Sequence, residues 1–207
     1  MTDTRRPGDD VIAALGRIPV TTVYEAAGKL GDVGPAVRPL VEGTRIAGRA
    51  FTVKAMPGDN MVVFRAIEEA PPGSVLVIDG GGTVDATIWG GSSTLACMAK
   101  GIVGCVTNAA ARDIDQIREL GFPLYAAGLN VRGTAKRHPG WVGLPIAMGN
   151  ATVHPGDIVL ADGDGVLIVA ATEAAEVLVR AEKKRSDEER RDARLKAGEP
   201  IRSVLGL

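Results

Sequence analysis

The sequence predicts an α/β fold with a mixed parallel and antiparallel sheet, followed by a charged C-terminal helix. Residues 75–113 read as a strand, a glycine loop, a glycine turn, a helix and a second strand. Two strands joined by a crossover helix are expected to lie parallel. Residues 131–170 form short extended runs separated by Gly, Pro and Asn, which favours antiparallel additions. Residues 172–196 are strongly helical and rich in charge.

The expected elements follow from hydrophobic spacing and from turn residues. Before the central unit we expect helices over residues 9–18 and 23–30, a strand over 44–55 and a helix over 60–70. The central unit itself supplies strands over 75–78 and 102–106 and a helix over 94–100. After it we expect a helix over 114–120, a strand over 122–126 and a hairpin formed by 158–160 and 166–169.

We expect a single α/β domain over residues 1–171 and a separate C-terminal helix and tail over residues 172–207. The apolar face of this helix nearly vanishes beyond Lys183, and the tail ends in the apolar residues Ile201, Val204, Leu205 and Leu207. A helix that is polar all round either projects into solvent or packs on a partner. We expect it to pack on a neighbouring subunit, although docking of the tail on its own chain explains the pattern equally well.

Composition bounds the functional classes. The 207 residues carry a formal charge of −1 and only 3% aromatic side chains, which argues against nucleic-acid binding. No apolar run approaches the roughly 20 residues that span a bilayer, so we expect no membrane contact. The polar N-terminus argues against a secretory signal, and Cys97 and Cys105 lack a redox or metal spacing. We therefore expect a cytoplasmic protein.

Candidate functional residues gather where the parallel strands end, which is where open α/β sheets usually bind ligands. The turn Gly90, Gly91, Ser92 and Ser93 begins a helix, so its free N–H groups favour a carboxylate or a phosphate. Arg112 can bind an oxyanion, and Asp113 can hold a divalent cation such as Mg²⁺. The alternatives are that a serine only caps the first helix and that Asp113 only caps the second.

Other chemistries have weaker support. The glycines do not follow the dinucleotide fingerprint, and no phosphate-binding P-loop motif occurs. His138 and His154 are 16 residues apart without an acidic partner at ligand spacing, which argues against zinc. A Schiff-base role remains open for Lys54, the single lysine in a predicted strand.

Five segments carry a resemblance to a known family, namely PPGSVLVIDGGG (71–82), AxxWGG (86–91), GIVGCVTNAAARD (101–113), GFPLYAAG (121–128) and VHPGDIVLADGDGVLIVA (153–170). The chain resembles the 4-hydroxy-4-methyl-2-oxoglutarate / 4-carboxy-4-hydroxy-2-oxoadipate aldolases, a family that also contains the regulator of ribonuclease activity A. RLKAGE (194–199) is similar to the tail of the aldolase branch, which the shorter regulator branch lacks.

The resemblance implies a core of the swivelling ββα type in a trimer or hexamer with active sites between subunits. It implies a class II aldolase that uses Mg²⁺ or Mn²⁺ to cleave a 4-hydroxy-2-oxo acid into pyruvate and a second keto acid. Oxaloacetate decarboxylation would pass through the same pyruvate enolate. By position, Asp113 would hold the metal and Arg112 the enolate oxygen, while the amides of residues 90–93 would hold the pyruvate carboxylate.

The chain departs from the family pattern at two positions. Many of these aldolases carry an acid where this chain has Gly91, and an Asp-Gly pair where it has Asn108-Ala109. Both changes remove a carboxylate near the metal, and the general base is therefore open. Candidates around the metal site are Asp79, Asn108, Asp85, and Glu188 or Glu189 of a neighbouring subunit. The alternative function is a non-catalytic regulator that binds an RNA-degradation enzyme.

Overall fold

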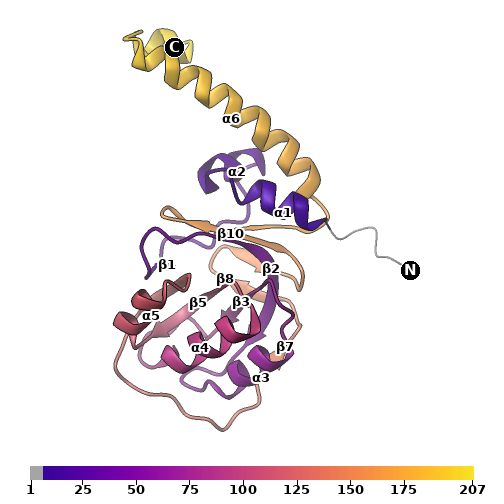
Figure 1. Cartoon of the computed structure of the whole chain (residues 1–207), viewed down its shortest axis with the longest axis vertical. Coiled ribbons are helices and arrows are strands. Elements are labelled where there is room, and N and C mark those ends of the chain that lie inside the picture. The colour runs from indigo at the N-terminus through magenta and orange to yellow at the C-terminus, as the bar shows by residue number, and fades with distance from the viewer. Residues whose placement is uncertain (1–6) are drawn as a thin grey trace, which may run out of the picture.

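The computed structural model describes residues 7–207 and has one main sheet of nine strands (Figure 1). The strand order is β1-β6-β5-β3-β2-β10-β11, with β4 paired to β5 and β7 paired to β2. Strands β2 to β6 form the parallel part, and β1, β7, β10 and β11 run antiparallel to their partners. The outermost strands β1 and β11 contact each other, so the sheet nearly closes on itself. The predicted mixed α/β fold is confirmed.

The strands are β1 (Arg38–Pro39), β2 (Ile46–Lys54), β3 (Ser74–Asp79), β4 (Thr87–Trp89), β5 (Gly104–Ala111), β6 (Leu124–Leu129), β7 (Trp141–Val142), β8 (Ile146–Met148), β9 (Ala151–Val153), β10 (Ile158–Asp162) and β11 (Gly165–Val169). The helices are α1 (Asp9–Leu15), α2 (Val20–Ala26), α3 (Met61–Glu69), α4 (Gly91–Lys100), α5 (Ile114–Leu120), α6 (Ala174–Lys196) and α7 (Ile201–Leu205). A separate two-stranded sheet joins β8 to β9.

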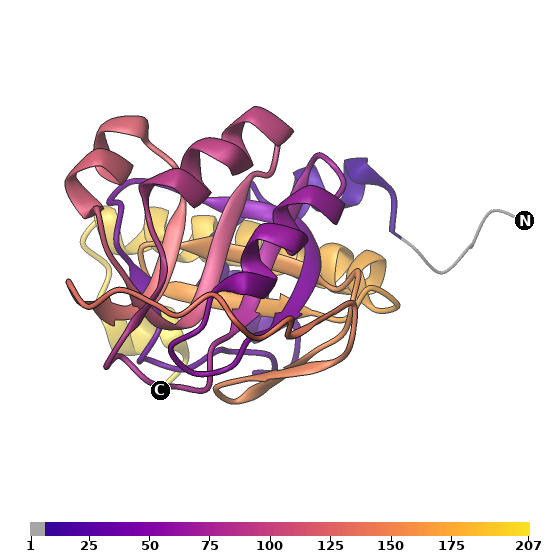
Figure 2. The same cartoon turned by 90° about the horizontal axis from the view of Figure 1, so that it is seen from below.

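Both faces of the parallel strands are covered, which explains why β3 is buried along its whole length and apolar between its two ends. Helices α3, α4 and α5 lie on one face of the sheet (Figure 2), and side chains such as Ile67, Cys97 and Ile117 share a buried cluster with β3. On the other face, Met148 and Val153 of the β8–β9 hairpin pack against the same strand. Strand β3 thus lies between two packed layers.

Helices α1, α2 and α6 form a third cluster with β10 and β11. The first half of α6 buries Ala174, Val177 and Ala181 in this cluster. Its second half extends away from the sheet and carries α7 at the far end (Figure 1). Ion pairs one turn apart line this polar half, as between Arg185 and Glu189. No helix in residues 7–207 has the length and apolar character needed to cross a membrane.

Several expected boundaries are wrong for identifiable reasons. The first helix ends at Leu15 and not at residue 18, and the second spans Val20–Ala26 and not 23–30. Gly28 and Lys29 have φ of 77° and 63°, a left-handed conformation in which the second helix cannot continue. Strand β6 is shifted toward the C-terminus of the expected run and reaches Leu129.

The largest difference concerns β5, which was expected over residues 102–106 but spans Gly104–Ala111. The register of β5 against β6 shifts between Thr107 and Ala110, and this irregularity absorbs Asn108 within the strand. The unexpected strand β4 pairs with this extension. The extension therefore carries the chain directly to Arg112 and Asp113.

Candidate active site

The pairing of β4 with β5 brings the glycine turn and the Arg-Asp loop together. Trp89, the last residue of β4, accepts a hydrogen bond at its carbonyl from the Arg112 N–H at 3.0 Å. The buried Trp89 ring donates from Nε1 to Thr94 Oγ1 at 2.9 Å, and Thr94 Oγ1 in turn donates to the Gly90 carbonyl at 3.2 Å. These bonds fix the start of α4 beside the end of β5.

The absence of side chains at Gly90 and Gly91 allows Asp113 to approach the start of α4. A Cβ atom at Gly90 would stand 2.7 Å from Asp113 Oδ2, closer than such contacts occur. Gly90 is extended, with φ of −164°, so the requirement for glycine is one of space. The Gly91 N–H then donates to Asp113 Oδ2 at 3.0 Å.

Asp113 has a left-handed backbone conformation, with φ of 58°, which is uncommon outside glycine and is often found at functional sites. It precedes α5, but its side chain makes no capping hydrogen bond to that helix. Its carboxylate lies instead at the positive end of the α4 dipole. Arg112 Nε is 3.7 Å from Asp113 Oδ2, and both side chains are about half exposed, at 48% and 45%.

Neither serine of the turn caps α4, because the N-cap residue is Gly90 and the cap lacks a side-chain hydrogen bond. Ser92 and Ser93 instead line a cavity of about 200 Å³ together with Arg112 and Asp113. We call this space the site cavity. The structure thus brings together the residues that the sequence placed in one site, although the Gly91 N–H that was assigned to a substrate carboxylate binds Asp113.

Sequence reasoning missed other residues that line the site cavity, namely Asn60, Phe64, Gly133, Thr134 and Lys136. Lys136 Nζ lies over the Phe64 ring, 5.3 Å from its centroid. The lining therefore holds two cations, Arg112 and Lys136, and one carboxylate, Asp113. This balance favours an acidic ligand, and a lysine in an irregular segment gave no sequence signal.

Asp59 accepts three backbone hydrogen bonds that fix the segment next to Lys136. Its Oδ2 atom accepts hydrogen bonds from the Arg137 N–H at 2.8 Å and the His138 N–H at 3.0 Å, and its Oδ1 atom accepts from the Met61 N–H at 3.0 Å. Burial alone would raise the pKa of Asp59, but the three N–H groups outweigh it and lower the pKa. The ionised carboxylate ties the segment that carries Lys136 to the start of α3.

Asp79 and Asn108 form a separate cluster at the end of β3. Asp79 Oδ1 accepts from Asn108 Nδ2 at 3.0 Å, and Asp79 Oδ2 pairs with Lys54 Nζ. Asn108 Oδ1 accepts from the Gly80 N–H at 2.7 Å. Burial would raise the pKa of Asp79, but the hydrogen bonds from Lys54, Asn108 and the Gly81 N–H, together with the Lys54 charge, lower it. Neither Asp79 nor Asn108 lines the site cavity.

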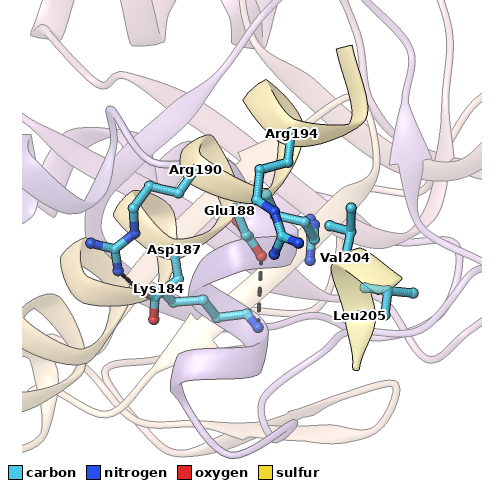
Figure 3. A pocket seen from close by; sticks show the side chains of 8 residues that line it. Lys184, Asp187, Glu188, Arg190, Arg194, Val204 and Leu205 are labelled. Carbon is cyan, nitrogen blue, oxygen red and sulfur yellow. Dashed lines mark hydrogen bonds and ion pairs between the residues drawn. The ribbon is translucent and has the colours of Figure 1, made fainter. Parts of the chain in front are cut away.

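The remaining candidates lie elsewhere. Asp85 is exposed outside the site cavity. Glu188 lies in a hollow of about 530 Å³ between α6 and α7 (Figure 3). Its neighbours Lys184, Arg190 and Arg194 are paired with acids. Its Oε2 atom accepts from Thr22 Oγ1 at 2.6 Å. Within one chain, neither Glu188 nor Glu189 lines the site cavity.

The donor atoms around the site cavity fit a hard divalent cation. In the part of the chain that the structure describes, no three His, Cys, Asp or Glu side chains converge on one point. Mg²⁺ needs no such cage, because it keeps several waters and uses one or two carboxylates. Asp113 supplies one carboxylate, and Asn60 Oδ1 is a buried oxygen without a hydrogen-bond partner among the described residues.

Comparisons with known proteins show the family and the fold that this chain shares. The family model described as RraA-like, Aldolase/RraA, matches residues 20–168. A protein of Halalkalibacterium halodurans, provisionally named as a 4-hydroxy-4-methyl-2-oxoglutarate aldolase, is 34% identical over 183 residues, which cover 88% of this chain and 87% of that protein. An uncharacterized protein from Pseudomonas syringae has a crystal structure similar to this fold, with a TM-score of 0.87, 30% identity, and coverage of 96% and 98%.

A second solved structure bears on the C-terminal tail. It is Streptomyces coelicolor RraAS2, described as an unusual member of the RNase ES inhibitor RraA protein family. The TM-score is 0.83 at 27% identity, and the match covers 91% of this chain and all of that one. This share exceeds residues 1–171, so the match reaches the C-terminal helix. The presence of the C-terminal helix therefore does not by itself separate aldolases from inhibitors.

Proposed function

Because this chain belongs to the RraA-like family, we propose that it is a class II lyase that acts on small 2-oxo acids with Mg²⁺ or Mn²⁺. The proposed substrates are a 4-hydroxy-2-oxo acid of the 4-hydroxy-4-methyl-2-oxoglutarate type, cleaved to pyruvate and a second keto acid, and oxaloacetate, decarboxylated to pyruvate. The observation that carries the proposal is the approach of Asp113 and Arg112 to the glycine turn that begins α4.

Both reactions need the same stabilisation. In the cleavage, the 4-hydroxyl loses its proton, the C3–C4 bond breaks, and its electron pair moves through C3 to the 2-oxo oxygen. In the decarboxylation, the bond to the C4 carboxylate breaks and CO₂ leaves. Either path gives pyruvate enolate, which takes a proton at C3 to become pyruvate. A bound cation would supply charge stabilisation for the enolate oxygen, and Asp113 would hold it.

The side chains of the site cavity divide the remaining roles. Arg112, which lines the site cavity, would donate hydrogen bonds to the oxygen on which negative charge develops. The N–H groups of Ser92 and Ser93 lie in the first turn of α4, where the helix dipole favours the pyruvate carboxylate. Lys136, which also lines the site cavity, would bind the second carboxylate of a dicarboxylic substrate.

The proton acceptor differs from what a carboxylate-rich site would provide. Asp113 is the one acid that lines the site cavity in residues 7–207, and its Oδ2 atom already accepts the Gly91 N–H. We therefore assign the base to a water molecule in the site cavity and not to a second carboxylate of this chain.

The test is pyruvate release from oxaloacetate and from 4-hydroxy-4-methyl-2-oxoglutarate, with Mg²⁺ or Mn²⁺ and then with EDTA. We expect turnover that EDTA abolishes and that Asp113→Asn lowers about 100-fold or more, since the variant removes a charge that is preorganised in the site. Asparagine tolerates the left-handed conformation of residue 113, so the backbone is preserved. A folded protein that turns over neither compound with metal present would refute the proposal.

A second candidate is a non-catalytic regulator that binds an RNA-degradation enzyme, and the match to RraAS2, which extends into the C-terminal helix, favours it. Binding of a purified ribonuclease of the RNase E type, together with no keto-acid turnover, would support this candidate. For either function we propose a homo-oligomer, a trimer or hexamer, in which the polar half of α6 packs on a neighbouring subunit. Light scattering of the full chain tests this, and a monomeric mass would contradict it.

A further inference from the structure

The side chain of Gln116 fills the space left by the missing side chain of Gly91. A Cβ atom built on Gly91 would stand 2.0 Å from Gln116 Oε1, 2.8 Å from its amide carbon and 3.5 Å from Nε2. Gln116 lies in the first turn of α5, three residues after Asp113, so both side chains can reach the same side of the helix. Its amide therefore stands where a side chain at position 91 would begin.

Two oxygen atoms from the start of α5 thus converge on Gly91. Asp113 Oδ2 accepts the Gly91 N–H at 3.0 Å, and Gln116 Oε1 packs against the Cα side of the same residue. One oxygen belongs to a carboxylate and the other to a neutral amide. A longer side chain at position 91 and the present position of Gln116 exclude each other.

We propose that Gln116 is a positioning residue for the cation held by Asp113. An amide can accept one hydrogen bond through Oε1 and donate others through Nε2, which suits it to orient a water ligand beside a carboxylate. Because the amide carries no charge, Gln116 would orient a water ligand from beside Gly91 without adding a second negative group next to Asp113. This inference rests on the proposed metal-dependent function.

The test measures Mn²⁺ binding directly, by titration calorimetry or by the electron paramagnetic resonance of free Mn²⁺. We expect Gln116→Ala to raise the Kd for Mn²⁺ about tenfold, the usual effect of removing a group that orients a metal ligand. Gln116→Glu keeps the oxygen and adds a charge, so it is expected to bind Mn²⁺ more tightly than the native protein. Glu119→Ala, an exposed position on the same helix, is the matched control and is expected to change nothing.

The outcomes separate the two proposals. Native Mn²⁺ affinity in Gln116→Ala, alongside metal-dependent turnover in the native protein, would overturn the role of Gln116 and leave the lyase standing. A raised Kd for Mn²⁺ in Gln116→Ala, with no keto-acid turnover by the native protein, would support the role of Gln116 and overturn the lyase proposal. Failure of the native protein to bind Mn²⁺ would overturn both.

A double substitution tests the exclusion between positions 91 and 116. Gly91→Asp alone must displace the Gln116 amide, and because this amide is the end of a flexible, exposed side chain, we expect the melting temperature to change little and one polar group beside Asp113 to replace another. In the Gln116→Ala background the space is free, and we expect the same substitution to be tolerated and to restore Mn²⁺ affinity at least to the native level. Equal and additive effects of Gly91→Asp in the two backgrounds would overturn the proposed exchange.

Discussion

Gly90→Ala is the sharpest perturbation of the site, because it adds one methyl group at the contact between α4 and Asp113. The new Cβ would stand 2.7 Å from Asp113 Oδ2, whereas ordinary van der Waals contact begins near 3.4 Å. The carboxylate must therefore retreat by about 0.7 Å, which lengthens the 3.0 Å hydrogen bond from Gly91 beyond the usual ~3.2 Å limit. The backbone of residue 90 is extended and accepts alanine without strain.

The expected magnitudes follow from that displacement. A misplacement of about 1 Å at a reacting centre can cost about 100-fold in rate, so we expect kcat/KM to fall about 10- to 100-fold. Stability should change little, because the lost hydrogen bond belongs to a side chain that is 45% exposed. About 1 kcal/mol, or a melting temperature lower by about 2–4 °C, is the scale for a chain of this length.

The assay combines metal-dependent pyruvate release, Mn²⁺ affinity and thermal unfolding. Gly163→Ala is the matched control, since it makes the same chemical change in open space on the β10–β11 turn, and native activity is expected. A Gly90→Ala protein with kcat/KM and Mn²⁺ affinity within about twofold of native would show that the position of Asp113 does not set the reaction.

Three further predictions address the surroundings of the site. Lys136→Met is expected to raise KM for oxaloacetate about tenfold while leaving inhibition by pyruvate unchanged, with Lys183→Met as the control; equal effects on both would refute a role in binding the second carboxylate. Lys54→Met removes a partner that lowers the pKa of Asp79, so we expect the free energy of unfolding in urea at pH 7 to fall by about 1–2 kcal/mol. The difference in this free energy between native and variant should narrow below about pH 4, as Asp79 becomes protonated. A difference that does not change with pH would contradict this reasoning. Asp59→Asn places an NH₂ group against backbone donors, so we expect a melting temperature lower by about 4–8 °C and a raised KM; an unchanged KM would separate Asp59 from the site.

The parts of the fold that could be read from the sequence are those with strong local signals. The all-apolar run of β3, the glycine stop of α4 at Gly101 and the spacing of α5 each determine one element, and α5 matches its expected bounds. β5 was harder, because Asn108 and three alanines resemble the end of a strand. They remain extended because the neighbours β4 and β6 complete their hydrogen bonds, and no local pattern reports those partners.

The site shows the same division. Residues adjacent to a glycine turn or to a strand end, such as Arg112 and Asp113, could be assigned to one edge because parallel strands place their carboxyl ends together. Lys136 and Gln116 could not, because their places depend on the path of an irregular segment and on the direction of one side chain. The contact of Gln116 with Gly91 follows from a missing atom, which a sequence records only as another glycine.

The two tryptophans of the chain lie in different surroundings, and this gives the protein an internal optical probe. Trp89 is 1% exposed, stacks on Phe122 with ring centroids 6.0 Å apart, and immediately precedes the glycine turn. Trp141 is 46% exposed, and its ring centroid lies 5.4 Å from that of His138. A soluble quencher such as iodide should quench the fluorescence of the exposed Trp141 but not that of the buried Trp89. The remaining fluorescence then reports ligand binding near Trp89 without any added label.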